Sequence, residues 1–202
     1  MTDSLPLDLM QVESLAPISE DTLRLLAQPG LQSVFLVGMM GAGKTTIGRQ
    51  LAKVLDRQFV DLDHELEARC GVRVSVIFDI EGEQGFRKRE TSALDACSRQ
   101  TSIVLATGGG AVISAENRAY LKQRGVVVYL RASAEELFRR VSRDKNRPLL
   151  QTSNPRQRLG ELLAEREPLY QEVADIVLET GSAPISTAVR NLLALLKEKK
   201  VA

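Results

Sequence analysis

The sequence predicts an α/β fold in which a central five-stranded parallel sheet lies between two layers of helices. Five short apolar segments alternate along the chain with longer segments of helical periodicity. The apolar segments show no polar alternation, and continuous apolar runs are typical of parallel strands that are covered on both faces. This succession of strands and helices favours a three-layer α/β/α architecture.

The composition is that of one ordinary globular domain. The chain has 202 residues, of which 44% are hydrophobic and 26% are charged, and its formal net charge is +1. Because there is neither a basic excess nor a long apolar run, we expect no nucleic-acid partner and no membrane association. The start of the chain lacks the features of a signal peptide, and two cysteines are too few for a disulfide scaffold. We therefore expect a cytoplasmic protein, and we expect it to be a monomer.

Residues 1–30 read as an N-terminal extension of unknown role, ahead of a domain that spans residues 31–202. The extension contains one helix candidate, residues 18–27, which begins at the N-cap candidate Ser19 and ends before a Pro-Gly pair. Terminal segments are often loosely held, so we assign this extension no function.

Within the domain, apolar runs predict the strands, and helical spacing with recognisable ends predicts the helices. Gly71 is typical of a helix C-terminus, Ser133 of an N-cap, and Asn154-Pro155 of a helix start. In chain order, the expected elements are the strand 34–37, the helix 47–55, the strand 58–61, the helices 62–70, 74–80 and 83–99, the strand 102–106, the helix 114–124, the strand 126–130, the helices 133–143 and 154–172, the strand 174–178 and the helix 184–199.

The segment after the first strand, Gly38-Met-Met-Gly-Ala-Gly-Lys44-Thr45, fits the phosphate-binding pattern G-x-x-x-x-G-K-[ST] in full. Its glycines let backbone N–H groups approach phosphate oxygens, and the following helix directs its positive end at them. We expect Lys44 to reach the β- and γ-phosphates of ATP, and Thr45 to offer a hydroxyl to Mg²⁺. The pattern indicates a P-loop NTPase fold, with ATP as co-substrate and Mg²⁺ as cofactor. The predicted nucleotide-binding residues of this loop are Gly41, Ala42, Gly43, Lys44, Thr45 and Thr46.

A P-loop occurs in several classes of enzyme and does not by itself specify a reaction. The sequence contains no Asn-Lys-x-Asp, the usual guanine-reading motif of GTPases, and the chain is too short for the additional machinery of a motor. A small-molecule kinase remains as the prediction. Two alternatives stay open here: a kinase for gluconate or a nucleoside monophosphate, and a nucleotide-dependent binding module that has lost catalysis. The intact charged residues of the nucleotide site argue against the second.

Three further features point to the acceptor. Asp61 and Asp63 follow the second strand, where one carboxylate can support Mg²⁺ and the other can accept a hydrogen bond from a hydroxyl; alternatively, Asp63 only caps the next helix. Glycines 108–110 follow the third strand and expose backbone N–H groups. Guanidinium groups suit carboxylates and phosphates, although sequence spacing alone does not show that they converge. The arginines concerned are Arg87, Arg147 and Arg166.

A set of spaced signatures covers roughly residues 33–200. They are the P-loop with its trailing Thr46-Ile47-Gly48, Phe59-Val-Asp-Leu-Asp63, Ile77-Phe with Gly82-Glu83, Phe86-Arg87 with Glu90, Thr107-Gly-Gly-Gly110, Arg147-Pro-Leu-Leu150, and Arg166 with Tyr170. Together they resemble the shikimate kinase family. The resemblance implies ATP-dependent phosphorylation of the 3-hydroxyl of shikimate to give shikimate 3-phosphate and ADP, in the pathway through chorismate to the aromatic amino acids. The implied partners are the small molecules shikimate and ATP.

The resemblance also implies roles for residues on the acceptor side. Arg87 and Arg166 would bind the carboxylate of shikimate, while Asp63 and the backbone of Gly109 would hold its ring hydroxyls. Asp63 would lie next to the hydroxyl that is phosphorylated. The substrate-binding residues implied in this way are Asp63, Arg87, Gly108, Gly109, Gly110 and Arg166.

On the nucleotide side, the resemblance implies that Asp61 lies near Mg²⁺ with Thr45 and that Arg140 lies along the adenine. A mobile lid at about residues 144–156 would close over ATP and bring Arg147 to the phosphates. Some members of the family carry an arginine in the loop before the last helix, and this loop has none here, so we expect backbone or apolar contacts to adenine. The catalytic residues implied are Lys44, Asp63 and Arg147.

Overall fold

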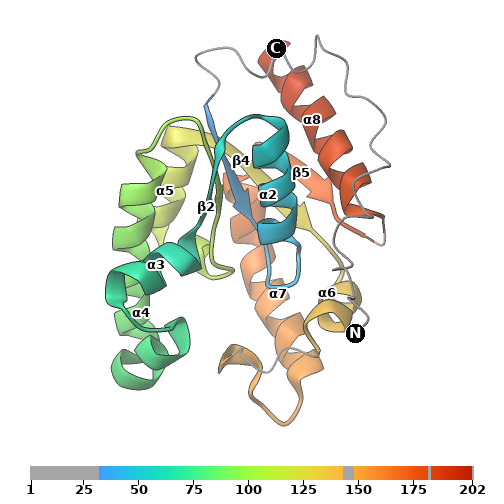
Figure 1. The fold of residues 1–202 in the computed structure, drawn as a ribbon. Coiled ribbons are helices and arrows are strands. Elements are labelled where there is room, and N and C mark those ends of the chain that lie inside the picture. The colour runs from blue at the N-terminus through green and yellow to red at the C-terminus, as the bar shows by residue number, and fades with distance from the viewer. Residues whose placement is uncertain (1–31, 143–147, 182, 202) are drawn as a thin grey trace, which may run out of the picture.

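A computed structural model describes residues 32–142, 148–181 and 183–201. Its five strands form one parallel sheet in the order β2-β3-β1-β4-β5, which confirms the predicted sheet (Figure 1). The strands are β1 Ser33–Val37, β2 Gln58–Asp61, β3 Ile103–Ala106, β4 Gly125–Arg131 and β5 Ile176–Glu179.

Helices cover both faces of this sheet. They are α2 Lys44–Val54, α3 Leu62–Cys70, α4 Val74–Ser98, α5 Ala115–Arg124, α6 Ala134–Val141, α7 Pro155–Val173 and α8 Ile185–Val201, with the 3-10 turns η1 Ala111–Ile113 and η2 Pro148–Leu150. α2 and α8 pack together on one face, and α5 and α7 pack together on the other, which confirms the three-layer architecture (Figure 1). None of the described helices combines the length and the apolar character that crossing a membrane requires.

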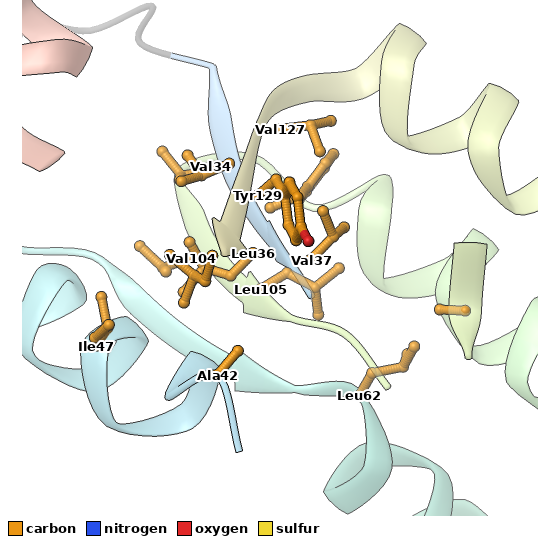
Figure 2. Close-up of a cluster of buried hydrophobic side chains, with 14 of the residues drawn as sticks. Val34, Leu36, Val37, Ala42, Ile47, Leu62, Val104, Leu105, Val127 and Tyr129 are labelled. Atoms are coloured by element: carbon orange, nitrogen blue, oxygen red, sulfur yellow. The ribbon is translucent and has the colours of Figure 1, made fainter. Parts of the chain in front are cut away.

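The core is built around the central strand β1, which has a neighbouring strand on either side. Figure 2 shows Val34, Leu36 and Val37 of this strand beside Val104 of β3 and Val127 of β4, and all five side chains have no exposed surface. Because helices cover both faces, both faces of β1 are buried, and this explains the apolar run that follows Ser33.

The ends of several helices follow the signals present in the sequence. Ser133 accepts from the backbone N–H of Glu136 in a capping box at the start of α6, and Asn154 caps α7 by accepting from the N–H of Gln157. Gly71 ends α3 in the left-handed region, at a φ of 69°. These local interactions fix where each helix begins or ends.

Most helices lie within two residues of their predicted bounds, and two regions differ by more. α2 begins at Lys44 rather than at residue 47, because the phosphate-binding loop runs directly into the first helical turn. The predicted helices 74–80 and 83–99 form the single element α4, which is interrupted at Gly82 by a non-helical conformation (φ 67°, ψ −177°). The helix candidate at 18–27 lies outside the described residues.

Gly48 lies in α2 where this helix packs on the sheet, and we predict that Gly48→Ala destabilises the protein. A Cβ at this position would lie 2.6 Å from Cε2 of Phe59 and 3.0 Å from Cδ1 of Leu36. Crowding of a packed core costs about 1–3 kcal/mol, whereas alanine gains only about 1 kcal/mol over glycine in helix propensity. The free energy of unfolding, measured by urea titration, should therefore fall.

Gly160→Ala in α7 is the matched control. No atom lies within 4 Å of a Cβ built at this position, so only the helix-propensity gain applies. We expect this substitution to raise the free energy of unfolding by about 0.5–1 kcal/mol. If both substitutions changed stability equally, the packing explanation for Gly48 would be wrong.

Candidate active site

The loop between β1 and α2 has the conformation that a phosphate-binding loop requires. Gly38, Gly41 and Gly43 have φ angles of 142°, 83° and 95°, which residues with side chains rarely adopt. Nζ of Lys44 donates to the carbonyls of Gly38 and Met39 over 2.8 and 3.0 Å, so the lysine folds back over the loop. The N-terminus of α2 and the lysine ammonium group therefore both face the loop, as anion binding requires.

Thr45 and Asp61 form a pair of oxygen ligands beside this loop. The Thr45 hydroxyl donates to Oδ2 of Asp61 over 2.8 Å. Mg²⁺ prefers such oxygen ligands, usually takes only one or two protein groups, and completes its shell with water and phosphate oxygens. No cluster of three or more His, Cys, Asp or Glu side chains suited to a metal occurs in the described residues. The pair thus fits a Mg²⁺ ion that binds together with a nucleotide.

Asp63 is the second residue of α3, in its first turn, and lines the same cavity as Asp61. The residue that caps α3 is Asp61, whose Oδ1 accepts from the backbone N–H of Asp63 over 3.2 Å. The alternative in which Asp63 merely caps this helix is therefore wrong. Asp63 is instead one of the residues that line the cavity.

A cavity of about 570 Å³ joins the phosphate-binding loop to these carboxylates. Residues 40–47 line it together with Asp63 and Gly109, and Gly181 and Ala183 line it after β5. The volume is within the range of small-molecule sites. One continuous space thus has a nucleotide-binding loop and a candidate acceptor carboxylate on its walls.

Arg140 of α6 lies on the wall of this cavity and connects two of its loops. Nη1 donates to the carbonyl of Gly41 over 3.1 Å, and Nη2 donates to the carbonyls of Thr180 and Gly181. The guanidinium group therefore links the phosphate-binding loop to the loop in which we expected adenine contacts. The part of that loop that lines the cavity offers backbone groups and small side chains, as expected from its lack of arginine.

The three glycines after β3 let charged side chains pack directly on the backbone. A Cβ on Gly108 would lie 2.6 Å from Oε1 of Glu90 and 3.0 Å from Oδ1 of Asp63. A Cβ on Gly110 would overlap the guanidinium group of Arg87. Any larger residue at these two positions would displace the charged groups, so the glycine loop brings Asp63, Glu90 and Arg87 together.

Arg166 reaches the same glycine loop from α7. It is only 2% exposed, and its Nη1 donates to the carbonyl of Gly109 over 3.4 Å. Its Nε is buried without a hydrogen-bond partner, and the described residues provide no carboxylate that forms an ion pair with it. Glu90 is near enough to interact electrostatically with Arg166 but forms no ion pair with it. Because a buried cation is costly without a direct partner, the position suits an anionic ligand.

Arg87 differs from Arg166 because acidic partners already surround it. Nη1 donates to Oε2 of Glu90 over 2.7 Å, and Nη2 donates to Oε1 of Glu83 over 2.9 Å. Its guanidinium group also lies against Gly110. The two arginines that sequence spacing could not bring together therefore both contact the glycine loop, Arg166 at Gly109 and Arg87 at Gly110.

Glu90 and Tyr170 also contribute to the site, although in the sequence they stand out only as members of the family signatures. Glu90 is 1% exposed; burial raises its pKa, the Arg87 charge opposes that rise, and Asp63 adds to it. Tyr170 donates its hydroxyl proton to the carbonyl of Gly109. The available signal was helical spacing, since Glu90 lies one turn from Arg87 and Tyr170 one turn from Arg166.

Part of the predicted site lies outside the described residues. Arg147 is in this part, as are the first residues of the predicted lid at 144–156. Of the lid, the structure describes residues 148–156, which comprise η2 and the start of α7. The other predicted site residues all lie on the cavity or on the glycine loop beside it.

Comparisons with known proteins agree on one family. The family profile described as shikimate kinase matches residues 40–197. The chain is 68% identical over 169 residues to a shikimate kinase of Bordetella pertussis (83% of this chain, 80% of the relative), and 61% identical over 189 residues to one of Bordetella avium (92% and 90%). Among solved structures, it is similar to shikimate kinase from Acinetobacter baumannii in complex with shikimate, with a TM-score of 0.84, 49% identity, and coverage of 86% of this chain and 97% of that one.

The buried carboxyl group of Glu90 should make the stability of the protein depend on pH. Because its pKa is raised above the ordinary value of 4.5, the folded state holds this proton more tightly than the unfolded state. The contribution of Glu90 to stability therefore decreases as the pH rises through this range. We predict that, relative to Glu90→Gln, the wild type loses stability as the pH rises above 4.5. Thermal denaturation of both proteins across this range measures the difference, and parallel curves would contradict the assignment.

Proposed function

The chain belongs to the shikimate kinase family, and on this premise we propose that its cavity binds ATP and shikimate side by side. The enzyme transfers the γ-phosphoryl group of ATP to the 3-hydroxyl of shikimate, and the products are shikimate 3-phosphate and ADP. This reaction belongs to the pathway through chorismate to the aromatic amino acids. The family match and a similar solved structure in complex with shikimate support the assignment.

The observation that carries the acceptor assignment is the buried guanidinium group of Arg166. It lies beside Gly109 and forms no ion pair with a carboxylate of the described residues, and Gly109 lies on the cavity of the phosphate-binding loop. A ligand carboxylate would supply the missing charge. Arg87, which lies against Gly110, provides a second guanidinium group, and the two arginines together form the proposed carboxylate clamp. Asp63 and the backbone of residues 108–110 then face the ring hydroxyls.

On the donor side, the phosphate-binding loop holds the polyphosphate of ATP. The residues concerned are Gly41, Ala42, Gly43, Lys44, Thr45 and Thr46. Thr45 and Asp61 hold Mg²⁺, which neutralises charge on the phosphates when it is bound. Arg140 lies along the adenine, and its contacts with Gly41 and Gly181 support this position.

The transfer itself needs positioning and charge stabilisation more than covalent chemistry by the protein. The bond between the γ-phosphorus and the bridging oxygen of ADP breaks as a bond forms from the 3-hydroxyl oxygen to the same phosphorus. Asp63 orients this hydroxyl and accepts its proton late in the step. Lys44 stabilises the charge on the transferring group, and Arg147, carried by the lid, adds to it.

We further propose that residues 31–202 form the catalytic domain and that residues 1–30 are an extension of it. The family match over residues 40–197 supports this division. We also propose that the active unit is a monomer. Both cysteines are free thiols, which is in keeping with a cytoplasmic location.

We predict that Asp63→Asn abolishes most turnover while ATP still binds. The amide cannot accept the proton, and loss of a general base typically lowers kcat by about 10²–10⁴-fold. A coupled assay of ADP release with and without shikimate measures turnover, and calorimetry measures ATP binding. Asp79→Asn, which changes an exposed acid on α4, is the matched control and should behave as the wild type. Normal turnover of Asp63→Asn would remove this residue from the mechanism.

The same assay tests the identity of the acceptor. If the wild type released no ADP with shikimate but phosphorylated gluconate or AMP, the proposed acceptor would be wrong.

Arg87→Lys should weaken shikimate binding selectively. A lysine cannot form the two parallel bonds of a guanidinium group with a carboxylate, and loss of such a pair costs about 2–5 kcal/mol, or about 30-fold or more in affinity. We expect the KM for shikimate to rise by at least this factor while the KM for ATP stays within about twofold. Arg89→Lys is the control, because Arg89 is on the same helix but pairs with Glu81 at the surface. A similar rise in both variants would refute the clamp.

A further inference from the structure

Tyr170 is a buried residue of α7 that touches both sides of the active site. Its side chain has no exposed surface. The hydroxyl donates to the carbonyl of Gly109 in the glycine loop and lies 3.4 Å from Sδ of Met39 in the phosphate-binding loop. It therefore occupies the junction between the donor loop and the acceptor loop.

The ring of Tyr170 is held in place by a second tyrosine. It stacks on Tyr129 of β4, with ring centroids 5.0 Å apart and an angle of 22° between the planes. Figure 2 shows Tyr129 among the buried side chains of the sheet. Burial raises the pKa of the Tyr170 hydroxyl above its ordinary value of 10.0, so the group stays protonated and remains a donor. The hydroxyl group of Tyr170 points in a fixed direction, because the stacked ring cannot rotate freely in a close-packed core.

The carbonyl of Gly109 receives donors from two successive turns of α7, Tyr170 and Arg166. In a planar trans peptide, the C=O and the N–H point in opposite directions, so a fixed Gly109 carbonyl also fixes the N–H of Gly110. In the described part of the chain, the N–H groups of residues 108–110 donate to no protein acceptor. Of these residues, Gly109 lines the cavity, so its N–H can bind a ligand there when the loop is held in one conformation.

Three consecutive glycines do not hold one conformation by themselves, because each has access to a wide range of φ and ψ. Arg166 is a poor anchor for them, since its bond to Gly109 is 3.4 Å long and its guanidinium group is the proposed ligand of the shikimate carboxylate. When Arg166 turns to that carboxylate, Tyr170 remains as the donor to Gly109. The tyrosine hydroxyl is therefore the anchor that does not depend on the substrate.

We infer that Tyr170 is a positioning residue for the acceptor: its hydroxyl holds the Gly109 carbonyl so that the N–H groups of the glycine loop stay directed at shikimate. The inference rests on the proposed function of this site. It assigns a specific task to a residue that does not itself touch either substrate.

The test compares Tyr170→Phe with Tyr129→Phe. Each substitution removes one buried hydroxyl and keeps the stacked pair of rings. The hydroxyl of Tyr129 has no hydrogen-bond partner within the described residues, so its removal should leave activity and melting temperature near the wild type. For Tyr170→Phe, we expect the KM and the calorimetric Kd for shikimate to rise about tenfold, which corresponds to the loss of one buried hydrogen bond, while the KM for ATP stays within about twofold.

The outcomes separate the possibilities. A rise confined to shikimate and to Tyr170→Phe supports the positioning role. Unchanged constants for shikimate, an equal rise for both substrates, or the same change in Tyr129→Phe would overturn it, because these results indicate no role or a general packing role. Shikimate-dependent ADP release by the wild type is measured in the same series. Its absence would instead refute the proposed function, so the two failures are distinguishable.

Discussion

The parallel pairing of β1 with β3 is the constraint on which the active site depends. Leu36 is in register with Ala106, and Asp61 of β2 is in register with the same residue, so three strands end in one row. The backbone N–H and the hydroxyl of Thr107 both donate to the carbonyl of Leu36, which extends the pairing beyond the strands. The phosphate-binding loop, the glycine loop and the carboxylates after β2 leave the sheet together at this row. Their separation is therefore set by strand spacing, as is general for ligands at the carboxyl edge of parallel sheets.

α7 supplies the second constraint, because two of its side chains, Arg166 and Tyr170, donate to the carbonyl of Gly109 in the glycine loop. The loop is enclosed by two cations, Arg87 and Arg166, and by two acids, Glu90 and Asp63. Glu90 engages Arg87, which leaves Arg166 as the cation whose charge no described carboxylate pairs. In the proposed function, a carboxylate of the acceptor would supply the ion pair that Arg166 lacks among the described residues.

Local sequence signals predicted the five strands, most helix ends and the phosphate-binding loop, because each depends on residues that are close together in the chain. The meeting of Arg87 with Arg166 depends on how α4 and α7 pack around the glycine loop, and no spacing in the sequence shows it; the family resemblance supplied that expectation. Glu90 and Tyr170 received no role because a glutamate or a tyrosine within a helix has no local feature that distinguishes a buried anchor from a surface residue. Only the burial of both, and their contacts with the glycine loop, identify them.

The division of tasks around Gly109 has a physical reason. A charged group that binds the substrate has to exchange one partner for another during each catalytic cycle, and it cannot also hold the loop in a constant position. A neutral hydroxyl with a raised pKa keeps the same protonation state across the physiological range, and it carries no charge that would compete for the substrate carboxylate. The stack on Tyr129 confines that hydroxyl to one direction. In the proposed arrangement, a constant anchor, Tyr170, and an exchangeable ligand, Arg166, thus lie on adjacent turns of a single helix.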